Sequence, residues 1–245
     1  MEICRSQPVT PPASLPGSPQ RLHNPFMVPL KAVSLRLRIA LGIAFFVLFI
    51  AVWTLVTLGG MVSPTFLADP LTMLQQGVVL FTEYNFLLDI GMTVMRVLSG
   101  FLLAAVIGVP LGIMMGAYKT WEAFLEPFVS FCRYLPASAF VPLLILWAGI
   151  GETQKILVIF IGSFFQIVLM VAVTVSGARR DLVEAAYTLG CSNRSIVRRV
   201  LIPGAAPGIA ELLRLVLGWA WTYVIVAELI GSESGIGHMI VDSQA

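Results

Sequence analysis

The residues best suited to chemistry or recognition in this sequence gather in one short basic segment between two long apolar stretches. Five of the fifteen Lys and Arg residues fall in it: Arg179, Arg180, Arg194, Arg198 and Arg199. The same segment holds the triplet Glu184, Ala185, Ala186, then Gly190 and Pro203. So many charged groups in a chain otherwise rich in hydrocarbon indicate a surface that meets water or another protein.

This segment, residues 179–203, is predicted to form two short helices joined by a tight turn. Asp181 stands as an N-cap with Glu184 three residues later, which is the pattern of a capping box. Gly190 fits the left-handed position at which helices often end. Ser192 or Asn193 can cap the second helix, and Pro203 is expected to stop it.

Each predicted helix has an apolar side that we expect to pack against the rest of the protein. These sides comprise Leu182, Ala185, Ala186 and Leu189 in the first helix and Ile196, Val197, Val200 and Leu201 in the second. The opposite side of the second helix is expected to be charged and to carry Arg194, Arg198 and Arg199. A basic loop that merely fixes membrane topology is the alternative. Such a loop would not need the alanine pair, the glycine or the caps. The pattern therefore favours a rigid helical hairpin that binds a cytoplasmic partner.

The composition places this segment in an integral membrane protein. The 245 residues are 58% hydrophobic and 11% charged, with a mean hydropathy of +0.92, whereas soluble domains carry about 25% charged residues. An intramembrane enzyme would need paired catalytic groups inside its spans, and the sequence has none. The three Cys and two His are too scattered to form a metal site, so we expect no catalytic residue, metal or cofactor.

Five stretches are long and apolar enough to span a bilayer, which takes about 20 residues. They are residues 39–61, 97–117, 128–150, 156–176 and 207–230. Residues 63–95 are too polar to span, and the sequence "ADPLTMLQQGVVLF" within them predicts a helix at the membrane interface. Residues 1–30 hold seven of the fifteen Pro and are expected to be a disordered tail. Residues 31–245 would then form a single membrane domain.

Lys and Arg near the span ends predict the orientation. Lys31, Arg36 and Arg38 precede the first span, whereas residues 62–92 hold no Lys or Arg. The N-terminus, the 118–126 loop and the 177–206 loop are therefore expected in the cytoplasm.

A few charged residues fall within or beside the spans, where ionisable groups are often functional. Arg96 could be an arginine that reaches to the interface, an attractor for an anionic solute at the outer face, or a partner for Glu228. Arg133, with Pro136 and Pro142, interrupts the third span. These three are either candidates for lining a path through the membrane or parts of a kinked helix packed on its partner.

The hairpin motif resembles the cytoplasmic signature of permease subunits of ABC importers. That signature is Glu-Ala-Ala, three residues, Gly, nine residues, then Ile-x-Leu-Pro. Glu184, Ala185, Ala186, Gly190 and Pro203 match it, with Val200 and Ile202 in place of its Ile and Leu. The resemblance covers residues 93–240, including "PASAFVPLLILWAGIGETQKI" and "AELIGSESGIGHMI". These stretches look like the nitrate, sulfonate and taurine branch of binding-protein-dependent permeases.

This resemblance implies an all-α, polytopic helical bundle in the bacterial inner membrane, with a sixth span expected beyond residue 245. It implies a path for a small solute such as nitrate, taurine or an alkanesulfonate. The implied partners are cytoplasmic ATP-binding subunits, a second permease copy, a substrate-binding protein and the lipid bilayer, with no nucleic acid. The chain has no G-x-x-x-x-G-K-[ST] phosphate loop, so ATP hydrolysis would fall to a partner. A passive channel or scaffold component is the alternative.

Overall fold

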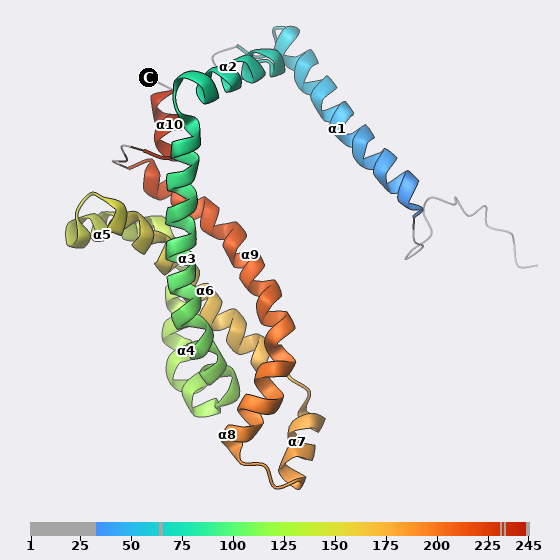
Figure 1. Ribbon diagram of the computed structural model, residues 1–245, viewed down its shortest axis with the longest axis vertical. Helices are drawn as coiled ribbons and strands as arrows, with labels where there is room; N and C mark the ends of the chain where they lie inside the picture. Colours follow the sequence, from blue (N-terminus) through green and yellow to red (C-terminus); the bar gives the residue numbers. More distant parts are fainter. Residues whose placement is uncertain (1–32, 64–65, 231, 233, 244–245) are drawn as a thin grey trace, which may run out of the picture. The chain divides into compact units, whose positions relative to one another are not determined.

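The computed structural model describes residues 33–63, 66–230, 232 and 234–243, and within them it contains helices and no strands (Figure 1). The expected disordered tail, residues 1–30, lies outside this described part. The helices are α1 (Leu35–Leu58), α2 (Pro70–Glu83), α3 (Phe86–Ala117), α4 (Lys119–Tyr134), α5 (Val141–Ala148), α6 (Glu152–Ser176), α7 (Arg180–Thr188), α8 (Asn193–Ile196), α9 (Ile202–Glu228) and α10 (Ile236–Asp242). A 3₁₀ turn, η1 (Ala137–Phe140), precedes α5, and a π-helical turn, η2 (Val197–Leu201), joins α8 to α9.

Four of the described helical segments are long and apolar enough to cross a membrane: α1, α3, α6 and the run Asn193–Glu228. A fifth results if α4 and the η1–α5 segment form one span, which bends by 90° at its break. The chain is thus an all-α polytopic bundle. It divides into two compact units after Gln75, a boundary that falls within α2.

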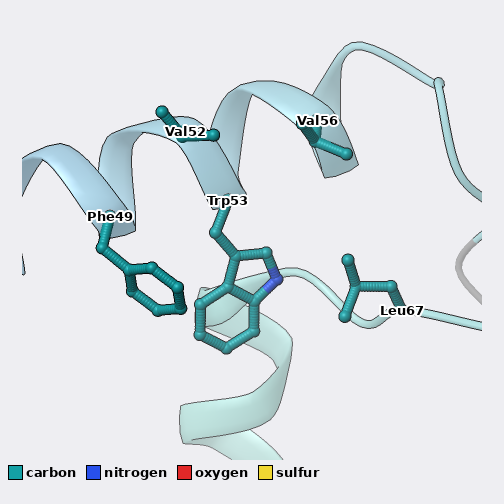
Figure 2. A pocket seen from close by; sticks show the side chains of 5 residues that line it. All are labelled: Phe49, Val52, Trp53, Val56 and Leu67. Carbon is teal, nitrogen blue, oxygen red and sulfur yellow. The ribbon is translucent and has the colours of Figure 1, made fainter.

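The first unit contains α1, a 24-residue helix with no buried residue within the described part of the chain. Ser34 caps it, and its Oγ accepts a hydrogen bond from the amide of Leu37 at 3.4 Å. Figure 2 shows an apolar hollow beside α1, lined by Phe49, Val52, Trp53, Val56 and Leu67. The Trp53 indole donates to the carbonyl of Ala68 at 3.2 Å. The residues that line this hollow are therefore aliphatic or aromatic, and none of them is charged.

The second unit is built on the close approach of α3 and α6. Small residues recur every four positions along α3, at Gly100, Ala104, Gly108, Gly112 and Gly116. A Cβ atom added at Gly112 would lie 2.6 Å from the carbonyl oxygen of Val168, and one at Gly100 would lie 2.7 Å from the Cβ of Ile159. The two backbones can approach this closely because small residues line the contact, as is common between helices in membranes.

The second span begins earlier than predicted, because α3 starts at Phe86 and not near Val97. Residues 86–95 were assigned to a stretch too polar to span. Two of their polar residues, Asp89 and Thr93, bond to protein groups. Paired polar groups are no obstacle to a long helix, and at 32 residues α3 is about 48 Å long.

Candidate functional site

The turn of the basic hairpin is as predicted, with Gly190 in the left-handed region at φ +76°. It ends α7, and its amide donates to the carbonyl of Tyr187 at 2.9 Å. The Tyr187 hydroxyl also donates to Asn193 Oδ1 at 3.1 Å, which ties the two arms of the hairpin together. A non-glycine residue in this conformation costs roughly 1–2 kcal/mol. Because Gly190 has no side chain, the backbone can turn here without that cost.

The predicted capping box is wrong, because α7 begins two residues earlier than the pattern suggested. Arg179 is its N-cap, with no side-chain cap bond, and Asp181 lies in the first turn. The Arg179 guanidinium donates to both Asp181 oxygens, and this lowers the pKa of the Asp181 carboxyl. Ser192 does occupy the N-cap of α8, but without a side-chain cap bond. Glu184 is therefore an exposed carboxylate with no capping role.

The inward side of α7 also differs from the prediction. Ala186 is buried in the same core cluster as Ile196 and Leu201 of the second arm. The other three members of the predicted apolar side, Leu182, Ala185 and Leu189, are exposed, and Leu189 has 82% of its surface accessible. A short helix packs against its neighbour along a narrow strip, so these three apolar side chains remain exposed. The hairpin thus presents an apolar patch beside Glu184 and exposed arginines.

Pro203 does not stop the second arm, contrary to the prediction. The chain remains helical from Asn193 to Glu228, a run of 36 residues. Proline lacks the amide that would bond one turn back. The π turn η2 ends at Leu201, two residues before Pro203, and π turns are one way that a helix absorbs such a break. The second arm is consequently the end of the same rod as α9.

A buried polar cluster lies at the opposite end of the bundle from the hairpin, where α3 and α6 begin and α9 ends (Figure 1). Its centre is Arg96, which is only 1% exposed. Arg96 Nε and Nη2 donate to the two oxygens of Glu152, each at 2.6 Å. Nη1 donates to Glu228 Oε1 at 2.6 Å and to the carbonyl of Ser234 at 2.8 Å. Nη2 also donates to Ser234 Oγ at 2.8 Å.

These contacts use all five N–H donors of the Arg96 guanidinium. An exposed interfacial arginine and an open attractor for anions are both inconsistent with this arrangement. Of the three interpretations of Arg96, the structure matches the pairing with Glu228. The result is an ion-pair network in which Glu152 is half-exposed, and it includes Lys155, whose Nζ lies 3.3 Å from Glu152 Oε1.

The network also fastens the segment before α10. Glu228 Oε2 accepts from the amide of Gly237 at 2.8 Å, and Asp89 Oδ1 accepts from the amide of Gly235 at 2.6 Å. Gly235 has φ +110°, and a Cβ atom there would lie 2.5 Å from both Arg96 Nη1 and Glu228 Oε1. The site therefore has no room for a side chain at Gly235.

Several members of this cluster were not singled out from the sequence: Asp89, Thr93, Glu152, Ser234 and Gly235. Thr93 Oγ1 donates to Glu228 Oε1 at 2.8 Å, across 135 residues of sequence. The usable signal was the placement of polar residues at the same end of three spans. That signal says which end they share, but not which side chains meet.

The third span is interrupted between α4 and the η1–α5 segment, at the residues that the sequence indicated. Helix α4 starts at Lys119 and ends at Tyr134, and Pro136 is the N-cap of η1. Pro142 lies in the first turn of α5, where a missing amide does no harm. Arg133 is half-buried at the end of α4 and lines a small cavity. The structure therefore brings Arg133 to an internal space, and leaves Pro136 exposed on the bend.

Comparisons with known proteins agree with this architecture. Residues 108–245 match the family of binding-protein-dependent transport system inner membrane components. A protein of Brucella melitensis biotype 1, named as a probable ABC transporter permease, is 36% identical over 206 residues, covering 84% of this chain and 82% of that one.

Two further relatives carry more specific names. The taurine transport system permease protein TauC of Escherichia coli K12 is 30% identical over 83% of this chain and 76% of its own length. The nitrate import permease protein NrtB of Synechococcus elongatus is 31% identical over 64% of this chain and 56% of its own length.

Among solved structures, an inward-facing form of the MetNI methionine ABC transporter aligns with a TM-score of 0.58 at 22% identity. The alignment covers 64% of this chain and 79% of that chain. At this level of identity the likeness concerns the fold.

Proposed function

The chain belongs to the family of binding-protein-dependent transport system inner membrane components, as an ABC importer permease of the nitrate, sulfonate and taurine branch; from this premise we propose that a separate ATPase drives it through the α7–α8 hairpin. The chain is a multi-pass inner membrane protein and a transport subunit. Its own sequence has no phosphate-binding loop, so ATP hydrolysis is assigned to a partner subunit.

The observation that carries this proposal is the exposed surface of α7. Leu182 and Leu189 are exposed apolar side chains on a hairpin that also displays Glu184 and five arginines. Apolar side chains held in water beside charged groups are typical of a protein interface. Because the basic hairpin is expected on the cytoplasmic side, the partner that it accepts is a cytoplasmic protein.

The continuity of the second arm gives the hairpin a mechanical role. A helical run of 36 residues extends about 54 Å. One end of this rod is the hairpin, and the other end is Glu228 in the buried polar cluster. A displacement of the hairpin by the ATPase would therefore reach the far end of the bundle along a single helix.

The substrate and the remaining partners follow from the family. We propose that the transported substrate is a small oxyanion or sulfonate such as nitrate, taurine or an alkanesulfonate. A substrate-binding protein would deliver it to this chain. A second copy of the chain would complete the path, with the N-termini in the cytoplasm. Glu184, Ala185, Ala186, Gly190 and Pro203 form the coupling motif. Of these, Ala186 acts from inside the hairpin, and Pro203 lies within the rod.

Co-purification tests the proposal. The tagged chain is extracted from its native membranes in mild detergent, and bound proteins are identified by mass spectrometry. We expect a subunit that carries a phosphate-binding loop. Its recovery should fall at least tenfold with Glu184→Lys, which reverses an exposed charge on α7.

Asp242→Lys is the matched control, because it reverses an exposed carboxylate on α10 at the other end of the bundle. It should retain the wild-type amount of the partner. Absence of any such subunit, or equal recovery with Glu184→Lys and wild type, would contradict the proposal.

A further inference from the structure

A small cavity lies where α4 ends, enclosed by α4, η1, α6 and α9. Arg133, Gly162, Gln166 and Tyr223 are among the residues that line it. Gly162 and Gln166 are each ten residues from the nearer end of α6, which places each of them about 15 Å from that end. The cavity therefore lies beside the middle part of the α6 span, where ionisable groups are rare and often functional.

Arg133 differs from Arg96 in how its hydrogen-bond donors are used. All five N–H donors of Arg96 bond to protein acceptors. Within the described part of the chain, Arg133 makes a single hydrogen bond, from Nη2 to the Tyr134 hydroxyl at 3.3 Å, and it pairs with no carboxylate. Its Nε is buried without any partner there. The half-buried guanidinium also stacks on the Tyr134 ring, with Cζ 4.9 Å from the ring centroid, but no protein acceptor meets its buried Nε. A positive group with an unmet buried donor favours an anionic ligand.

Two neutral groups add further hydrogen-bonding capacity to the cavity. Gln166 contributes an amide from α6, and Tyr223 contributes a hydroxyl-bearing ring from α9. Gly162 makes room for that ring, since a Cβ atom there would lie 2.7 Å from Tyr223 Cδ2. The site thus combines one positive charge with neutral donors, and none of its lining residues is acidic.

The size of the cavity limits what it can take. Its volume is about 40 Å³, whereas one water needs about 10–15 Å³ of such space. About three oxygen-sized atoms therefore fit, as many as the oxygens of nitrate or of a sulfonate group. We propose that this cavity binds the oxyanion head of the transported solute, with Arg133 as the charged ligand and Gln166 and Tyr223 as neutral ones.

This inference rests on the proposed transport function and adds a binding site inside the permease to it. A solute held only by the external binding protein would need no charge at this depth. A planar guanidinium suits the trigonal arrangement of oxygens in nitrate and sulfonate better than an ammonium does. The site should therefore distinguish these anions from chloride, which lacks that geometry.

Anion-dependent stability of the purified full-length chain tests the site directly. Thermal unfolding is followed in detergent while sodium chloride is replaced by sodium nitrate or sodium methanesulfonate at constant ionic strength. Wild type should show a saturable rise in unfolding temperature with either oxyanion. Arg133→Gln should weaken that response at least tenfold in concentration, and Arg133→Lys should weaken it less.

Arg214→Gln is the matched control, because it removes an exposed arginine from α9 away from the cavity, and its response should equal that of wild type. If Arg133→Gln does not fold, Gln166→Leu takes its place and should also weaken the response. A wild-type response that is unchanged in the cavity variants, or no response in wild type, overturns the inference. Recovery of the ATPase subunit is measured on the same preparations, so failure of the cavity site is distinguishable from failure of the proposed transport function.

Discussion

Arg96 and Glu228, separated by 132 residues in the sequence, form an ion pair of 2.6 Å in which both side chains are almost fully buried. The pair joins the first third of α3 to the end of α9. Glu152, which is half-exposed, pairs with the other side of the Arg96 guanidinium.

Breaking this pair from one side should destabilise the fold, since an unpaired charge would remain buried. We expect Glu228→Leu to cost about 3–5 kcal/mol, seen as a lower unfolding temperature in detergent. Arg96→Leu should do the same, and the double variant should cost less than the sum of the two. Glu211→Gln, at an exposed position of α9, is the control and should have little effect. Strict additivity of the two leucine variants would argue against direct coupling.

The contact between α3 and α6 yields a second prediction. A Cβ at Gly112 would clash with the Val168 carbonyl and with the side chain of Val171. Gly112→Ala should force the helices apart and destabilise the chain by about 1–3 kcal/mol. Gly91→Ala lies on the same helix with nothing within 4 Å of the added atom, so it should be neutral or slightly stabilising. Equal unfolding temperatures for the two variants would refute the close packing.

The hairpin turn yields a third prediction, which separates backbone conformation from side-chain size. Gly190 has a left-handed backbone and open space around its Cβ position. Asn tolerates this conformation far better than a β-branched residue does. Gly190→Asn should therefore retain most ATP-driven uptake, whereas Gly190→Val should lose most of it at equal membrane expression. If both variants were equally active, the turn would have no role in coupling.

Local chemistry allowed the sequence to predict some of these features. Gly190 was identified correctly because a left-handed turn depends on one residue and its neighbours. The charged side of the second arm was also predicted, since Arg194, Arg198 and Arg199 follow helical spacing and are exposed.

The incorrect predictions concern features that depend on backbone adjustments or on contacts between distant parts of the chain. Pro203 was read as a helix stop, yet a π turn absorbs its missing amide and the rod continues. Asp89 and Thr93 made residues 86–95 look too polar for a span, because their partners at Gly235, Ile236 and Glu228 lie far along the chain. Spacing alone could not show that Arg96 has all its donors satisfied while Arg133 does not.

Uptake into proteoliposomes tests the central claim most directly. The chain is reconstituted with its co-purified ATPase and binding protein, and accumulation of labelled nitrate or taurine is measured with and without Mg-ATP on the ATPase side. We predict accumulation above the external concentration that requires ATP and is lost with Gly190→Val. Equilibration without ATP, at a rate that the hairpin variant does not change, would contradict the account and identify a passive channel.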